Sequence, residues 1–204
     1  YSGADHDYNT AVGYKALYAT TSGDYNVALG ANALQANTSG GTNVALGYGS
    51  LYGNTTASYN TAVGVQALYS NTTSAESTAV GYQALFTSNN TGGNAGNTAV
   101  GHQAAYYTTT GYNNVAVGRS ALVSTTTGYN NTAVGYQANF SNQTGIDSTA
   151  IGYKALYSCT YANNTAVGSQ ALQATTTAYN NVAVGLAAGY SNTTGGQNTF
   201  LGKD

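Results

Sequence analysis

Side chains that could carry acid–base or metal chemistry are few in this sequence, and they are scattered. Among 204 residues, six are Asp or Glu, four are Lys or Arg, two are His and one is Cys. General acid–base catalysis and Ca²⁺ binding both need carboxylates that converge on one place. The carboxylates are those of Asp5, Asp7, Asp24, Glu76, Asp147 and Asp204. They share no spacing, so we expect neither a catalytic pair nor a repeated calcium site.

The other reactive groups are equally isolated. His6 and His102 lie far apart, and no serine has a histidine partner in a recognisable arrangement. Cys159 is the only cysteine, so the chain has no disulfide framework and no thiolate metal cluster. The pair Gly92-Gly93 lacks the lysine of a phosphate-binding loop. We therefore predict no catalytic residue, no metal site, no cofactor and no enzyme activity.

The low charge also limits the partners. Charged residues make up 5% of the chain, which is too few for the basic surface that binds nucleic acid or an anionic membrane. No apolar run reaches the length of a membrane-spanning helix. The chain begins at Tyr1 without a methionine or a signal peptide, so we expect a mature or excised segment of a longer protein.

Amide side chains offer a different chemistry, because they recur at one fixed place before a recurring glycine. Counting that glycine as position 0, position −4 is Asn in ten turns and Ser in two. Amides stacked at the spacing of neighbouring strands can each donate a hydrogen bond to the next carbonyl. The predicted ladder consists of Asn9, Asn26, Asn43, Asn60, Asn97, Asn114, Asn131, Asn164, Asn181 and Asn198.

The recurring glycine sets the architecture that positions these amides. It stands at Gly13, Gly30, Gly47, Gly64, Gly81, Gly101, Gly118, Gly135, Gly152, Gly168, Gly185 and Gly202. Of the eleven intervals, nine are 17 residues, one is 20 and one is 16. A short fixed period predicts a solenoid in which each turn contacts mainly its neighbours. We therefore predict one continuous domain, 1–204, that is all-β: a parallel β-roll or β-solenoid of about twelve turns.

The residues before the glycine predict one short strand per turn. Position −3 is Thr or Val and position −1 is Val, Leu or Ile, so these two face one way while −4 and −2 face the other. Position −2 is Ala in eleven turns, which indicates close approach of a second backbone. We expect this Ala face to pack against copies of itself in a homo-oligomer with parallel axes. The predicted close-packing residues are Ala11, Ala28, Ala45, Ala62, Ala79, Ala99, Ala116, Ala133, Ala150, Ala166 and Ala183.

After the glycine, position +3 is mostly Ala, +4 mostly Leu and +5 mostly aromatic, which predicts a second short strand or a tight bend. The aromatic rings should stack along the axis with their hydroxyls in water. Positions +7 to +9 are rich in Thr and Asn and are expected to form an outer arm. Several Asn-x-Thr or Asn-x-Ser glycosylation sequences occur in the chain, including those at Asn37, Asn54, Asn71 and Asn192. The candidate surface-contact residues are Tyr18, Tyr52, Tyr69, Tyr106, Tyr157, Thr109, Thr126 and Thr176.

The repeated pentad resembles the head repeat of the YadA-like trimeric autotransporter adhesins, and Ser148-Thr149-Ala150-Ile151-Gly152 comes closest to the family signature Asn-Ser-x-Ala-Ile-Gly. The resemblance covers all twelve turns. It implies a left-handed parallel β-roll, a side-by-side homotrimer and an extracellular adhesive or spacer role. The longer units at 60–68 and 131–138 are also similar to repeats of phage tail fibres.

Three functions remain open. The first is an extracellular, cell-surface or virion-surface fibre segment that makes weak repeated contacts with host-cell surfaces or glycans. The second is a self-assembling extracellular filament subunit. The third is an ice-binding solenoid that uses its Thr columns. The sequence leans against ice binding, because position +7 mixes Asn with Thr and the arm varies in length.

Overall fold

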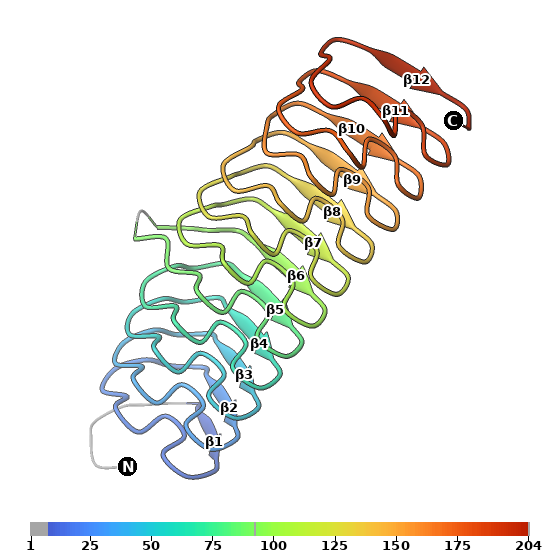
Figure 1. Cartoon of the computed structure of the whole chain (residues 1–204). Helices are drawn as coiled ribbons and strands as arrows, with labels where there is room; N and C mark the ends of the chain where they lie inside the picture. Colours follow the sequence, from blue (N-terminus) through green and yellow to red (C-terminus); the bar gives the residue numbers. More distant parts are fainter. Residues whose placement is uncertain (1–7, 92, 204) are drawn as a thin grey trace.

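The computed structural model describes residues 8–91 and 93–203, and it is a parallel β-solenoid (Figure 1). Twelve strands of three residues form a single sheet in chain order. They are β1 (Thr10–Val12), β2 (Val27–Leu29), β3 (Val44–Leu46), β4 (Thr61–Val63), β5 (Thr78–Val80), β6 (Thr98–Val100), β7 (Val115–Val117), β8 (Thr132–Val134), β9 (Thr149–Ile151), β10 (Thr165–Val167), β11 (Val182–Val184) and β12 (Thr199–Leu201). The predicted all-β solenoid is confirmed. Asp5, His6, Asp7, Gly92 and Asp204 lie outside the described residues.

The strand register is kept across both irregular intervals. Thr78 pairs with Thr98 across the interval of 20 residues, and Thr149 pairs with Thr165 across that of 16. The three additional residues of the longer interval lie in the arm that joins β5 to β6 (Figure 1). A parallel bridge between Ala75 and Asn94 ties this arm to the preceding turn. Loops accommodate insertions that a strand ladder cannot, because an insertion in a strand would shift its register.

The Ala residues of position −2 point into the coil of their own chain. The prediction that they form an outer face packed on other copies is therefore wrong. Every Ala of position −2 from Ala28 to Ala183 is fully buried inside the chain's own coil. These alanines form one apolar core with the Leu residues of position +4. Each coil closes on itself, so its narrow interior holds one Leu and leaves room only for a methyl group opposite. The Val, Leu and Ile side chains of position −1 instead point outward, and Leu29 is 50% exposed.

The segment after each glycine is a tight bend and not a second strand. Leu at position +4 has a positive φ of 50 to 52° in all eight turns that carry it, and position +2 is also left-handed in every described bend. A non-glycine residue in this conformation costs roughly 1–2 kcal/mol. Complete burial of a Leu side chain contributes about 1.5–3 kcal/mol, which offsets that cost. The Leu backbone N–H still bonds to the next turn, as in Leu34 N–H to Ser50 O at 3.0 Å.

Asn139 is a misfit in this Leu column and yields a stability prediction. It occupies position +4 with φ 50°, it is 1% exposed, and neither its Oδ1 nor its Nδ2 has a hydrogen-bond partner. A buried amide without partners is destabilising. We expect Asn139→Leu to raise the free energy of unfolding by about 2 kcal/mol, even though Asn tolerates a positive φ better than Leu. Urea unfolding followed by circular dichroism measures the difference.

The matched control is Asn130→Leu, at another left-handed position with φ 56°, because Asn130 is exposed and its Nδ2 donates to Asp147 Oδ1 at 3.0 Å. This control should lower the stability slightly. A decrease caused by Asn139→Leu as large as that of the control would show that the buried amide is satisfied in solution.

Candidate functional site

The Asn side chains of position −4 form a buried ladder along one inner edge of the solenoid. Asn43 illustrates one step: its Nδ2 donates to Asn26 Oδ1 at 3.1 Å and to Ala57 O at 2.9 Å. Its own backbone N–H donates to Asn26 Oδ1 at 3.0 Å. The amide therefore joins the strand to the preceding turn and to the arm of its own turn. This combination holds the register and closes each coil.

The same Oδ1 to backbone N–H bond recurs in nine steps of the ladder, from Asn9 to Asn26 through Asn181 to Asn198. The two Ser positions interrupt it. Ser148 Oγ accepts a longer bond of 3.3 Å from the Asn164 N–H, whereas Ser77 Oγ is buried and has no partner. The ladder is continuous within three blocks of turns. Its amides form their hydrogen bonds within the solenoid and therefore serve the fold.

A second amide column lies at position +7, which the sequence placed in the outer arm. Asn37, Asn54 and Asn71 are fully buried there. Asn71 Nδ2 donates to Asn54 Oδ1, and Asn54 Nδ2 to Asn37 Oδ1, both at 2.9 Å. The glycosylation sequences at these three positions therefore have an inaccessible amide, whereas Asn192 in the same column is partly exposed. Position +7 carries only Asn, Thr, Ser or Cys, and this restriction to small side chains was the signal in the sequence for an inward position.

The Thr column of position +8 lies on the arm surface. The hydroxyls of Thr109, Thr126 and Thr176 donate to the carbonyl oxygens of Thr126, Gln143 and Thr193 in the next turn, each at 3.1 Å. Their hydrogen atoms are consequently occupied within the protein. The column presents methyl groups and acceptor lone pairs to solvent, which weakens the case for a water-ordering array.

The aromatic column of position +5 stacks along the axis in two blocks. Tyr52, Tyr69, Phe86 and Tyr106 stack with successive centroid distances of 4.9, 5.2 and 5.0 Å. Val123 ends this block, and Tyr157 stacks on Phe140 in the next. Burial, followed by the neighbouring phenols, raises the pKa of Tyr69 and Tyr106 above the ordinary Tyr value. Tyr18 is followed by Gln35 in its column and is 72% exposed.

Further ring stacks at other positions were missed by reading position +5 alone. They are Tyr8–Tyr25, Tyr82–His102, Tyr112–Tyr129 and Tyr136–Tyr153, with centroid distances between 4.7 and 5.6 Å. Their signal in the sequence was a shared offset from the glycine, as for Tyr136 and Tyr153 directly after it. His102 thus stacks on the phenol ring of Tyr82.

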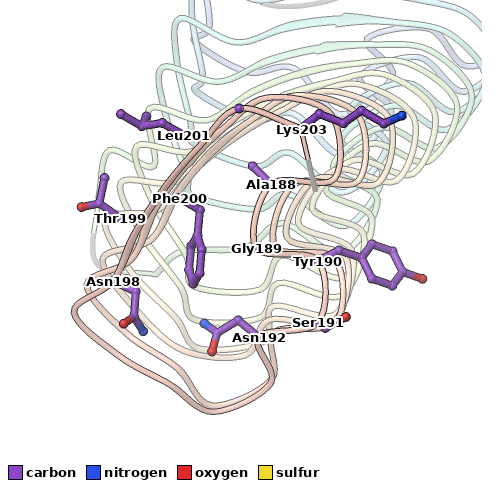
Figure 2. Close-up of a pocket in the computed structure, with 11 residues that line it drawn as sticks. Ala188, Gly189, Tyr190, Ser191, Asn192, Asn198, Thr199, Phe200, Leu201 and Lys203 are labelled. Atoms are coloured by element: carbon purple, nitrogen blue, oxygen red, sulfur yellow. The ribbon is translucent and has the colours of Figure 1, made fainter.

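The outward face of the sheet is an uncharged surface that runs along all twelve strands. We call the first and third residues of every strand the sheet face. It consists only of Thr, Val, Leu and Ile, and it carries no charged residue. Figure 2 shows its orientation at the C-terminal turn, where Thr199 and Leu201 point away from the coil while Phe200 points into it. Exposed aliphatic side chains that are aligned along a whole molecule usually mark an interaction surface.

The open interior at the C-terminal turn forms a pocket of about 640 Å³ lined by residues 188–192 and 198–203. Phe200 replaces the usual Ala of position −2, and Gly189 replaces the usual Leu of position +4. A Cβ atom on Gly189 would lie 2.7 Å from a ring carbon of Phe200, so the ring takes the space of the missing Leu. The pocket is therefore the end of the solenoid core (Figure 2).

The titratable groups remain dispersed in space. No group of three or more His, Cys, Asp or Glu side chains that could hold a metal ion occurs within residues 8–91 and 93–203. Glu76 accepts a bond from Asn94 Nδ2 at 2.7 Å. Cys159 is buried, and burial raises the pKa of its thiol while hydrogen bonds with the Tyr161 backbone and the Asn164 side chain partly oppose the change. A protonated buried thiol is unreactive.

Comparison with known proteins finds no matching family model, no matching curated protein and no matching solved structure. Within the part of the chain that the structure describes, no helix has the length and apolarity to cross a membrane.

Proposed function

We propose that this chain is a non-enzymatic segment of an extracellular fibre, which assembles side by side with copies of itself and presents Tyr and Thr columns for multivalent attachment to surfaces. The observation that carries the proposal is the sheet face. Its aliphatic side chains are aligned at the strand spacing through all twelve strands without one charge. Covering such a strip removes apolar area from water, and a second copy offers a strip of matching period.

A trimer is the proposed assembly, because three such sheets can face a common axis, as in the adhesin heads that the pentad resembles. The arms and the aromatic columns would then remain on the outside. Each fibre would expose three sets of equivalent columns, and weak single contacts would add up through multivalency. The occupied Thr hydroxyls make the fibre function a better fit than ice binding.

The proposal is tested by placing charges on the sheet face. Val117→Lys with Val134→Lys puts two adjacent ammonium groups at the third residue of β7 and β8, where the side chains are half-exposed. Other strands carry the larger Leu or Ile at this position. We expect the assembled form to dissociate to monomers, because burying unpaired like charges is strongly unfavourable. Sedimentation velocity measures the mass, and circular dichroism verifies the fold.

The matched control is Thr109→Lys with Thr126→Lys, which puts the same two charges on neighbouring turns of the arm surface. This variant should keep the mass of the unmodified chain. Assembly that survives the sheet-face charges, or that is lost equally in the arm variant, would count against the proposed interface.

A further inference from the structure

One hexapeptide, Gly-Tyr-Lys-Ala-Leu-Tyr, occurs twice, at 13–18 and at 152–157. Lys15 and Lys154 in these segments are two of only four cationic residues in the chain. Each lies at position +2 of a bend, between a Tyr at +1 and a Tyr at +5. The same local structure therefore presents the same three side chains at the first and the ninth turn.

The lysine in each bend is held over both neighbouring rings. Lys15 Nζ lies 5.3 Å from the ring centroid of Tyr14 and 5.7 Å from that of Tyr18. Lys154 Nζ lies 5.4 Å and 5.2 Å from the centroids of Tyr153 and Tyr157. Cation–π attraction at these distances restrains a flexible ammonium group on an exposed surface. Within the described residues, neither ammonium group forms an ion pair with a carboxylate, so its charge is available to a ligand.

The rings of these two bends also lack an aromatic neighbour in the following turn. Ala31 and Gln35 follow Tyr14 and Tyr18 in their columns, and Ser169 and Gln173 follow Tyr153 and Tyr157. In the second bend, Tyr153 and Tyr157 stack on Tyr136 and Phe140 of the preceding turn, so each ring is open on its other face. Tyr153 is 47% exposed. Tyr14 and Tyr18 are 69% and 72% exposed. The two bends thus combine accessible aromatic surface, an amide side chain in the next turn and a restrained cation.

We infer that these two bends are binding sites for a carboxylate-bearing saccharide. The apolar C–H face of a sugar packs against tyrosine, the phenol hydroxyls bond to sugar hydroxyls, and the ammonium group pairs with the carboxylate. Eight turns separate the sites, which is roughly 38 Å along the axis at the usual strand spacing. A long acidic polysaccharide can therefore engage both. The inference rests on the proposed attachment function and gives it a ligand class.

Isothermal titration calorimetry of the full chain with a tetramer of galacturonic acid tests the inference, with the methyl-esterified tetramer as the uncharged ligand. We expect the acid to bind, and Lys15→Gln with Lys154→Gln to weaken binding by about tenfold or more through loss of the charge-assisted bond. Lys203→Gln is the matched control outside the hexapeptides and should bind as the unmodified chain does. Rising salt should weaken the binding of the acid.

Equal binding of the acid and its ester, equal binding by the double variant, or absence of binding would each overturn the inference. The native mass of the same samples separates this failure from failure of the fibre proposal. An assembled chain that does not bind the acid contradicts only the saccharide site, whereas a monomeric chain contradicts the fibre assembly whatever it binds.

Discussion

Gly118→Ala is expected to lower the free energy of unfolding by about 3–5 kcal/mol, because two costs act together at this position. Gly118 has a φ of +129°, a conformation that residues with a Cβ rarely adopt. A Cβ atom there would also lie 2.5 Å from Gly135 O and 2.7 Å from Gly135 C in the next turn. The turns would have to separate at the strand end. Urea unfolding monitored by circular dichroism measures the loss.

Gly93→Ala separates these two costs. Gly93 has a similar φ of +118°, but nothing lies within 4 Å of the place that a Cβ would take. This variant should therefore lose only about 1–2 kcal/mol, which is the conformational cost alone. If both variants lost the same stability, the close approach of successive glycines would not be a constraint on the fold.

Asn114→Leu is expected to cost about 2–5 kcal/mol, since it removes the partners of two buried backbone groups. Asn114 Nδ2 donates to Gly128 O at 2.8 Å, and Asn114 Oδ1 accepts from the Asn131 N–H at 3.0 Å. Leucine has a similar size but can replace neither bond. Hydrogen exchange of the Asn131 amide should accelerate together with the fall in stability.

Asn114→Ser is the graded control, because Ser stands naturally at two positions of the ladder. Ser148 Oγ accepts the Asn164 N–H, so a serine oxygen can preserve one of the two bonds, although Ser77 Oγ has no partner. We expect this variant to retain about half of the stability that Asn114→Leu loses. A serine variant as unstable as the leucine variant would show that the bond to the arm carbonyl, and not the one between turns, dominates.

The period and the alternation of residue types were sufficient to predict the solenoid and the position of its strands. Position −4 could be recognised as a ladder because one amide recurs where one strand follows another. The irregular intervals were also readable, since their length changes avoid the pentad. These features are local and recur in every turn, so the sequence of each turn gives independent support for the same structure.

The direction of the strand faces could not be read from alternation alone. Both faces are small and uncharged, and the Ala face that was expected to pack on other copies proved to be the interior of the chain's own coil. What decides is the volume inside the coil, where the Leu of position +4 already fills the space opposite Ala. Position +7 was wrongly predicted to lie on the surface, because polar Asn and Thr residues are typical of exposed positions. Its Asn amides are buried because hydrogen bonds between successive turns satisfy them.

The contacts between Lys and Tyr side chains could not be predicted by comparing equivalent positions of successive turns. Lys15 and Lys154 interrupt position +2, which is Gln in five other turns. Only the structure brings each ammonium group over two rings from different positions of its bend. Such a site depends on the combination of columns within one turn rather than on the repetition of one residue.

The native mass of the unmodified chain, measured by light scattering over a range of concentrations, tests the proposed side-by-side assembly most directly. The sheet-face interface predicts a discrete particle of three times the chain mass of 20.6 kDa. A mass of one chain at every concentration would contradict the assembly, and open-ended growth with concentration would replace it with a filament.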